Sequence, residues 1–262
     1  MPRRAMVTFF ALLVLGPLAG THHPSAPRTA VSVGSHPLIP GGPSSGQTKN
    51  FGWASSNWSG YARTGGTGAF HSVTGRWTVA SVSPTSKATY SSSWVGIDGF
   101  NNSHLIQTGT EADYYNGAAH YDAWWEILPA PETVIRGITV SPGNIMTATI
   151  TKGSGSSWTI TITDKSTGKT FSTIQQYTGP QTSAEWIEEA PSVNGHIATL
   201  AHYGAVKFDP GTVNGSNPKL VAAESGYMVQ GGKRVSTPSN PDSDTDGFKC
   251  AYGSTQPAPP AS

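Results

Sequence analysis

Residues 158–174 read W-T-I-T-I-T-D-K-S-T-G-K-T-F-S-T-I, and this stretch carries the clearest structural signal in the chain. Two runs rich in Thr and apolar residues, W-T-I-T-I-T and K-T-F-S-T-I, flank a turn in T-D-K-S-T-G at 163–168, which contains the turn-forming residues Asp, Ser and Gly. Successive side chains of a strand point to opposite faces, so such runs fit strands with one buried face. The stretch therefore predicts a β-hairpin.

The same pattern of short strands and turns continues on both sides of this hairpin, from Trp53 onward. No stretch shows the sustained 3.6-residue period of an amphipathic helix, and no repeat has the spacing of propeller blades or solenoids. The sequence therefore predicts an all-β fold, a single antiparallel β-sandwich. Further strands are expected over residues 74–82, 91–97, 121–128, 145–151 and 198–208.

The composition excludes several classes of protein. Charged residues make up only 12% of the 262 residues and the formal net charge is +1, which argues against a basic nucleic-acid binder. The chain has 8 Trp, 9 Tyr and 8 Phe, too many for a disordered protein, and its 31 Gly and 20 Pro do not suit a helical bundle. The single cysteine, Cys250, cannot form an internal disulfide, so apolar burial must hold the domain together.

The first 20 residues have the pattern of a secretory signal peptide. Arg3 and Arg4 precede an apolar run from Ala5 to Leu18, which is followed by small residues. This run is too short for a stable membrane span. We therefore expect residues 1–20 to be a signal peptide and the mature protein to be secreted and extracellular, with no membrane partner.

Composition divides the rest of the chain into three segments. Residues 21–52 are rich in Pro, Gly, Ser and Thr, and we interpret them as a pro-segment or linker. Residues 53–253 form the predicted sandwich domain, and residues 254–262 are expected to be a disordered tail. The match to a G-x-S-x-G nucleophile elbow at residues 42–46 lacks a flanking strand and helix, so we dismiss it.

Several predicted strands place aromatic, carboxylate and amide side chains on one face, because alternate residues of a strand share a face. If the sheet curves, this face becomes a groove. Such a groove fits sugar binding and glycoside hydrolysis, or peptide binding and amide hydrolysis; a solvated face that binds nothing is a third possibility. The sets are Trp94, Gly96 and Asp98; Leu105, Gln107, Gly109 and Glu111; Asp122, Trp124, Glu126 and Leu128; Glu185, Ile187 and Glu189.

Other catalytic and metal-binding patterns are missing from the sequence. It has no H-E-x-x-H and no Cys/His spacing for zinc, and nothing marks a particular Ser for a Ser-His-Asp triad. Residues 242–247, D-S-D-T-D-G, imitate the start of a calcium loop, but position twelve is Gly253 rather than Glu. We therefore interpret them as a solvated turn, and we expect no metal and no cofactor.

Five short motifs follow one another between Asn57 and Gly253, which is nearly all of the predicted domain. They are N-W-S-G at 57–60, W-V-G-I-D-G at 94–99, L-I-Q-T-G at 105–109, Y-D-A-W-W-E at 121–126 and A-E-W-I at 184–187. In this order they resemble the eqolisins, or glutamic peptidases, the scytalidoglutamic-peptidase-like family of secreted acid proteases.

The resemblance implies a concanavalin-like sandwich of two curved antiparallel sheets and a catalytic pair, Gln107 and Glu185. It also implies a pepstatin-insensitive acid endopeptidase made as a zymogen, whose basic pro-segment blocks an acidic cleft. The chain departs from the fungal pattern at Glu111, where Asp is usual, at Leu128, where an aromatic is usual, and in lacking the fungal disulfides. These departures bear on substrate preference and acid stability. The implied substrate-binding residues are Trp58, Trp94, Asp98, Glu111 and Glu126.

The reaction can be argued from the two residues themselves. Amide hydrolysis needs a base that activates water, a donor to the oxyanion and an acid for the leaving amine. Glu185 can serve as base and then as acid by passing on one proton, and the Gln107 amide can donate to the oxyanion. With an ordinary pKa of about 4.3, Glu185 would favour acidic operation. We expect a monomer that acts on polypeptide substrates.

Two other functions stay open at this point. A glycoside hydrolase or lectin on the same sandwich would need two carboxylates about 5–10 Å apart, such as Glu126 with Glu185, and would tolerate loss of Gln107. A non-catalytic adhesive or structural domain would tolerate substitution of all three residues.

Overall fold

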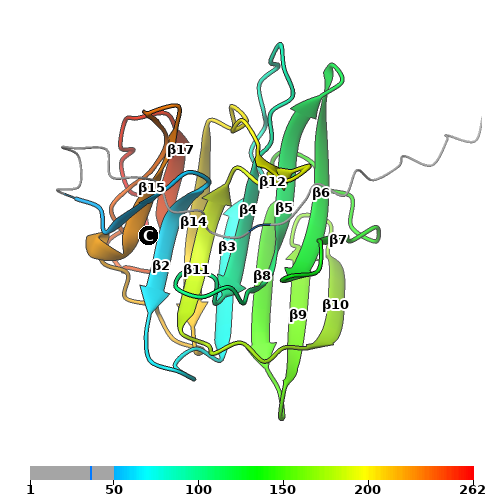
Figure 1. The fold of residues 1–262 in the computed structure, drawn as a ribbon, viewed down its shortest axis with the longest axis vertical. Coiled ribbons are helices and arrows are strands. Elements are labelled where there is room, and N and C mark those ends of the chain that lie inside the picture. The colour runs from blue at the N-terminus through cyan, green and yellow to red at the C-terminus, as the bar shows by residue number, and fades with distance from the viewer. Residues whose placement is uncertain (1–35, 37–49) are drawn as a thin grey trace, which may run out of the picture. The chain divides into compact units, whose positions relative to one another are not determined.

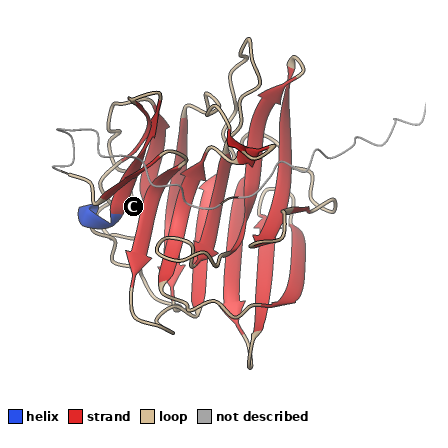
Figure 2. Cartoon of the chain, in the orientation of Figure 1, coloured by secondary structure: helices blue, strands red, loops and turns tan. Residues whose placement is uncertain are grey.

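The computed structural model describes residue 36 and residues 50–262, and the regular structure in them is almost entirely β (Figures 1 and 2). Within these residues the one helix is the short 3-10 helix η1 (Ala222–Glu224), and none is long and apolar enough to cross a membrane. The strands are β1 (Trp53–Ser55), β2 (Trp58–Thr64), β3 (Ser72–Thr78), β4 (Ser92–Ile97), β5 (Ile106–Tyr115), β6 (Ala118–Ile127), β7 (Thr133–Val134), β8 (Ile145–Lys152), β9 (Ser157–Asp164), β10 (Lys169–Gln176), β11 (Ser183–Glu189), β12 (Ser192–Val193), β13 (His196–Ile197), β14 (Ala205–Val213), β15 (Ser225–Gln230), β16 (Lys233–Pro238) and β17 (Phe248–Tyr252).

Some expectations fall on residues that the structure does not describe. The signal peptide at 1–20 and the dismissed elbow at 42–46 lie outside the described residues. So does the pro-segment at 21–52, apart from His36 and residues 50–52. His36 matters below, because it lies in the candidate site.

Apart from β1 and the separate pair β12-β13, the strands form a continuous hydrogen-bonded path in the order β10-β9-β8-β3-β14-β17-β16-β15-β2-β11-β4-β5-β6-β7. Pairing along this path is antiparallel, and β1 adds a parallel contact to β15. Side chains join the two halves of the path. Trp77 Nε1 on β3 donates to Thr110 Oγ1 on β5 at 2.9 Å, and Trp186 Nε1 on β11 donates to the Thr74 carbonyl on β3 at 2.8 Å. The predicted all-β antiparallel sandwich is confirmed.

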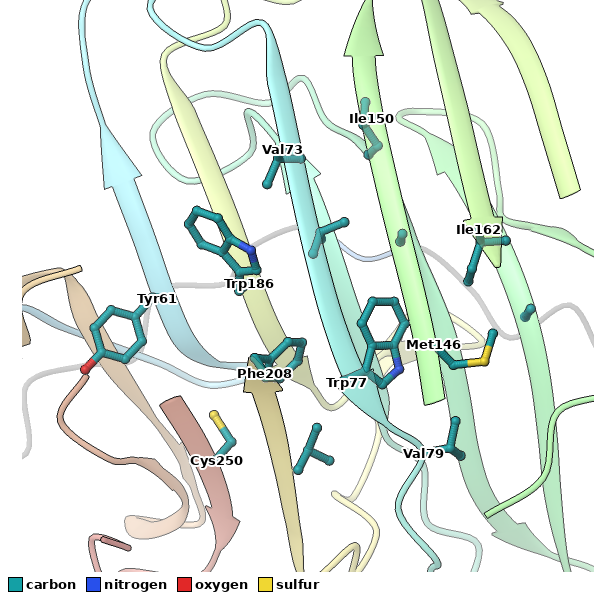
Figure 3. Packing of buried hydrophobic residues seen from close by; sticks show 14 of the residues in the cluster. Tyr61, Val73, Trp77, Val79, Met146, Ile150, Ile162, Trp186, Phe208 and Cys250 are labelled. Atoms are coloured by element: carbon teal, nitrogen blue, oxygen red, sulfur yellow. The ribbon is translucent and has the colours of Figure 1, made fainter. Parts of the chain in front are cut away.

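The main core lies between these halves and is rich in aromatic residues (Figure 3). Trp77, Trp186 and Phe208 are buried in it, and Cys250 is a buried free thiol beside them. Truncating a buried aromatic of this kind typically costs about 3–5 kcal/mol. A core of large aromatics therefore replaces the disulfides that this chain cannot form.

The hairpin expected at 158–174 is present. Strands β9 and β10 pair in register from Lys169↔Asp164 to Gln176↔Ser157. Along β9 the buried Trp158, Ile160 and Ile162 alternate with partly exposed Thr residues, as the sequence pattern predicted.

Two expected strands are wrong in their limits. The strand expected over 74–82 is β3, which begins at Ser72 and ends at Thr78. The sequence predicted a strand over 198–208, but β14 begins at Ala205 and runs to Val213. The preceding residues form a loop whose apolar side chains, including Leu200 and Tyr203, are buried. Their hydrophobicity reflects packing under a loop, and Gly204, with φ of +71°, ends that loop. Residues 254–262 have no regular structure, yet Gln256 Nε2 donates to the Pro238 carbonyl at 3.2 Å.

Candidate active site

The two proposed catalytic residues lie in one row across the sheet. Glu185 on β11 pairs with Gly96 on β4, Gly96 pairs with Gln107 on β5, and Gln107 pairs with Glu126 on β6. Residues directly opposite one another in paired strands point to the same face. The structure therefore brings Glu185, Gln107 and Glu126 together on one face, which is the face opposite to the main core.

Gly96 separates the proposed pair. Neighbouring strands lie about 4.8 Å apart, so the Cα atoms of Glu185 and Gln107 are about 10 Å apart. Because Gly96 has no side chain, the longer Glu and Gln side chains can reach the space above it from either side. A methyl group on Gly96 would come within 2.9 Å of Trp94 and 3.0 Å of Leu105. Trp94 and Leu105 therefore leave no room for a side chain at position 96, and glycine leaves the space between Glu185 and Gln107 free.

Gln107 is held by Glu126 and retains free hydrogen-bonding capacity. Its Nε2 donates to Glu126 Oε2 at 2.6 Å, while its Oε1 is buried and has no hydrogen-bond partner among the described residues. An amide nitrogen carries two hydrogens, so a second donor remains. Burial raises the pKa of Glu126 to about 7, with the charge of Glu189 adding to the effect. This residue therefore fixes the amide and itself titrates near neutrality.

Glu185 is buried, and the one group that favours its charged form is the nearby Ser183 hydroxyl. Neither of its carboxylate oxygens has a hydrogen-bond partner among the described residues. Burial raises the pKa of Glu185 well above its ordinary value, and the nearby Asp98 charge adds to the shift. The expectation of a near-normal pKa is therefore wrong for this state of the protein, because the carboxyl group is desolvated.

Two tryptophans predicted to bind substrate lie on the same face. Trp94 precedes Gly96 by two residues, and Trp58 on β2 pairs with Glu189 on β11. The Trp58 and Trp94 rings meet edge to face with centroids 4.8 Å apart. Trp94 Nε1 donates to Glu189 Oε2 at 2.7 Å, whereas Trp58 Nε1 has no partner in the described part of the chain. With Leu105, Trp124 and Ile187 they form a second apolar cluster, separate from the main core.

Glu111 also shares this face, because it pairs with Ser92, four residues before Gly96 on β4. It is buried, and burial raises its pKa well above the ordinary value, with the charges of Glu132 and Asp113 adding. It thus extends the acidic character of the face away from the Glu185 row.

Asp98 lies just beyond the end of β4 and has a different environment. Its carboxylate accepts hydrogen bonds from Tyr177 Oη at 2.6 Å, from the backbone N–H groups of Gln181 and Thr182, both at 2.8 Å, and from Asn102 Nδ2 at 3.0 Å. These contacts fasten the loop that leads into β11, the strand that carries Glu185. Both oxygens are occupied by protein, which suits a positioning residue better than a group that contacts substrate.

His36 reaches this face from the segment expected to be a pro-segment. Its ring stacks on Trp124 with centroids 4.2 Å apart and planes 1° from parallel. Nδ1 lies 2.9 Å from Glu189 Oε2 and Nε2 lies 3.2 Å from Glu132 Oε2. Both ring nitrogens face carboxylate oxygens, which accept but do not donate when ionised, so the ring is an imidazolium.

The electrostatics of His36 agree with this reading. Burial by itself lowers its pKa, but the Glu189 charge and the hydrogen bonds to Glu132 and Glu189 raise the pKa well above the ordinary value. His36, Glu111 and Glu132 are also close enough together to hold a metal ion. The imidazolium already supplies the positive charge there, however, and leaves no ring nitrogen free as a ligand.

Sequence reasoning missed three residues of this face as site candidates. Glu189 and Trp124 appeared in the same-face sets and could have been selected on that signal. His36 could not, because it lies in a segment without a strand pattern.

A second group that could hold a metal ion lies elsewhere in the fold. It consists of Asp209, Asp242 and Asp246. Residues 243–246 form an exposed or partly exposed bend, as the interpretation of a solvated turn requires, but Asp242 at its start is only 5% exposed.

Comparison with known proteins places this arrangement in context. The Peptidase A4 family profile matches residues 56–252. Aspergillopepsin-2 from Aspergillus niger is 32% identical over 178 residues, which are 59% of this chain and 62% of that protein. Scytalidopepsin B from Scytalidium lignicola is 35% identical over 139 residues, which are 51% of each protein. The matched part of the chain thus spans less than two thirds of either curated relative.

Solved structures give the same answer for the fold. A scytalido-glutamic peptidase bound to a transition-state analog inhibitor matches with a TM-score of 0.65 and 26% identity, over 75% of this chain and 98% of that chain. The aspergilloglutamic peptidase from Aspergillus niger matches with a TM-score of 0.54 and 27% identity, over 63% of this chain and 99% of that chain.

Proposed function

The chain belongs to the Peptidase A4 family, and on this premise we propose that it is an endopeptidase that hydrolyses peptide bonds with Glu185 and Gln107. One observation carries the assignment of these residues. In a single row of the sheet, Glu185 presents two unpartnered carboxylate oxygens and Gln107 presents an unpartnered amide oxygen, with only Gly96 between them. Buried polar groups are normally hydrogen-bonded, so such groups indicate a site that awaits water and substrate.

The reaction follows from the roles of these two groups. Ionised Glu185 takes a proton from a water molecule as the water oxygen attacks the scissile carbonyl carbon. The carbonyl π electrons move to oxygen, and the free N–H of Gln107 donates to that oxyanion. Glu185 then passes its proton to the amide nitrogen as the C–N bond breaks. Water has then been added across the peptide bond, and Glu185 is again a carboxylate.

Glu126 acts as a positioning residue in this scheme. Glu126 accepts one of the two Nε2 hydrogens of Gln107 and so orients the amide. The second hydrogen is then directed toward the space between Gln107 and Glu185. Trp58, Trp94 and Glu111 would line the cleft on either side of the substrate. Asp98 would hold the loop before β11 and so keep Glu185 in place.

We also propose that the chain is exported as a latent precursor in which His36 occupies the cleft. The support is the stacked, doubly ion-paired ring on Trp124. Desolvation is the leading cause of the raised Glu185 pKa, so the closed cleft favours the neutral carboxyl group, which cannot act as a base. Withdrawal of His36 and entry of water would lower that pKa toward its ordinary value and restore acidic operation.

The glycosidase alternative is weaker on this geometry. Glu126 and Glu185 are three strand spacings apart in the row, so their Cα atoms are about 14 Å apart. Their carboxyl groups would have to reach toward each other past Gln107 to come within the roughly 5–9.5 Å found in glycosidases. The Gln107 amide also stands between them and is bonded to Glu126.

A cleavage assay separates the reaction classes. The wild type, after removal of the pro-segment, is incubated with a denatured protein at about pH 3–4 with pepstatin present. Glu185→Gln is the test variant, and Glu224→Gln is the matched control, since Glu224 pairs with Arg63 outside the row. We expect hydrolysis by the wild type and the control, and none by Glu185→Gln. Wild type that cleaves polysaccharide but no protein would overturn the proposal.

A further inference from the structure

The segment D-S-D-T-D-G at 242–247 forms an acidic cluster outside the cleft, together with a residue distant in sequence. Asp209 on β14 brings a third carboxylate to Asp242 and Asp246. One carboxylate oxygen from each of the three lies within 4.8 Å of the others. The sequence lacked an acid at position twelve of a calcium loop; the fold supplies an acid from a neighbouring strand.

Asp242 closes the backbone turn of the segment. Asp242 Oδ1 accepts hydrogen bonds from the backbone N–H groups of Asp246 and Gly247, each at 3.1 Å. Calcium loops place acids at positions 1, 3 and 5 and a glycine at position 6, where the chain turns sharply. Asp242, Asp244, Asp246 and Gly247 occupy those positions.

Gly247 is also required by the close approach of the carboxylates. A Cβ atom there would lie 2.4 Å from Asp242 Oδ2 and 2.7 Å from Asp209 Cβ. The glycine therefore allows Asp209 and Asp242 to converge, which a larger residue would prevent.

Two oxygens of the cluster have no partner. Asp242 Oδ2 and Asp246 Oδ1 are buried and accept no hydrogen bond from any described residue. Only 5% of Asp242 is exposed. Buried charge is costly unless it is paired or coordinates a metal. Lys207 Nζ contacts only Asp209 Oδ2 of this group, at 2.9 Å, and its side chain is 46% exposed.

We propose that Asp209, Asp242 and Asp246 form a calcium-binding site that fastens the β16–β17 loop to β14. All three ligands are carboxylate oxygens, which suit a hard cation. Ca²⁺ accepts six to eight oxygens in flexible geometry, whereas Mg²⁺ demands a near-ideal octahedron. The site is structural and uses none of the residues assigned to hydrolysis.

Calcium binding and stability are the direct tests. Full-length wild type is titrated with CaCl₂ by calorimetry at about pH 7.5, well above the ordinary pKa of aspartate. We expect a dissociation constant of about 10⁻⁴–10⁻³ M, as for extracellular calcium modules. Thermal unfolding in 10 mM Ca²⁺ should occur about 3–7 °C higher than in EDTA, and equimolar Mg²⁺ should give a smaller shift.

Asp246→Asn is the first test variant, and Asp242→Asn the second. Asn at 242 keeps an oxygen for the two turn hydrogen bonds. Asp164→Asn is the matched control, because Asp164 is buried and closes a similar turn. Both of its oxygens are occupied: Oδ1 accepts from the backbone N–H groups of Ser166 and Thr167, and Oδ2 accepts from the Thr167 hydroxyl. Both test variants should lose the calcium-dependent shift, and the control should keep it at a lower overall stability.

Two results would overturn the site. One is a wild type with no heat of binding and no calcium-dependent shift in unfolding temperature. The other is a shift that persists undiminished in Asp246→Asn, which would locate calcium elsewhere. If Asp242→Asn fails to fold, Asp246→Asn still decides, because Asp246 Oδ1 makes no hydrogen bond that the substitution could remove.

Discussion

Asp98, just beyond the end of β4, and Glu185, on the neighbouring strand β11, are both buried carboxylates, but their hydrogen bonding differs. Asp98 accepts hydrogen bonds from Tyr177, Gln181, Thr182 and Asn102. Glu185 is as fully buried and accepts none from the described residues. Burial alone therefore does not distinguish a structural acid from a reactive one, whereas the number of donors does. A carboxylate whose oxygens are fully hydrogen-bonded stabilises the fold, and one that accepts no hydrogen bonds is available to water and substrate.

Removing Asp98, the fully hydrogen-bonded acid, should have the largest effect on stability. Asp98→Ala leaves the buried Tyr177 hydroxyl and two backbone N–H groups without their acceptor. We expect the free energy of unfolding to fall by about 3–5 kcal/mol. Denaturant titration at pH 5 measures it. A loss below about 1 kcal/mol would show that Asp98 is not the anchor of the loop, and the contrast with Glu185 would disappear.

Removing the Gln107 amide, which lies beside Glu185 in the row, should affect the catalytic rate more than the stability. Gln107→Ala deletes the proposed oxyanion donor and should lower kcat about 10²–10³-fold in the processed enzyme. Gln176→Ala on β10 is the control, since Gln176 is exposed and bonds only to Ser156 among the described contacts. Unchanged kcat in Gln107→Ala would remove Gln107 from the mechanism.

His36 tests whether the cleft is closed by its own chain. His36→Ala removes two charge-assisted contacts and should raise the activity of the unprocessed precursor about 10–100-fold at pH 6. Initial rates are measured on a short peptide while mass spectrometry confirms that the precursor is intact. His104→Ala, at an exposed position, is the control. A precursor that stays as latent as the wild type would contradict the assignment.

The pH dependence of His36 anchoring has a defined sign. A raised histidine pKa means that its contribution to stability is present at low pH and lost as pH rises through the raised value. Raising the pH through that value should therefore weaken the hold of Glu132 and Glu189 on the ring.

Glu126 gives the smallest effect in the series and a sharp pH signature. Its pKa rises from 4.5 to about 7 on folding, so the folded state binds the proton more tightly than the unfolded state. Its ionisation therefore weakens the fold as pH rises through that interval. Glu126→Gln should be about 1–3 kcal/mol more stable than the wild type at pH 8 and equally stable at pH 4. Unfolding temperatures measured across this range that show no crossover would contradict the shift.

Other buried acids extend this behaviour to the whole domain. Burial raises the pKa values of Glu111, Asp113, Glu185 and Glu188 well above their ordinary values. Each favours the folded state when protonated. Acid should therefore stabilise this protein over a range in which salt-bridged proteins lose stability, a stronger reason for acid tolerance than its low content of charged residues.

The sequence allowed prediction of strand faces but not of strand register. Alternation placed Gln107, Glu111 and Glu126 on polar faces, and the hairpin at 158–174 appeared as predicted. The direct alignment of Glu185 and Gln107 on either side of Gly96 depends on pairing between strands far apart in sequence, which local pattern does not encode.

The remaining failures have the same cause. The Asp209 carboxylate reaches residues 242–247 only because β14 pairs with β17. His36 has no strand pattern around it, and its place is defined by Trp124, Glu132 and Glu189. The raised Glu185 pKa is a property of desolvation by the assembled face, so no reading of its neighbours in sequence could give it.

The most direct test of the account is to remove the charge of Glu185 and measure rate and stability together. For processed Glu185→Gln, kcat/KM on a peptide substrate and the free energy of unfolding at pH 7 are compared with the wild type. We predict a loss in kcat/KM of about 10³–10⁴-fold with stability unchanged or increased, because an unpartnered buried charge has been removed. A variant that is destabilised like Asp98→Ala and keeps its kcat/KM would contradict the account.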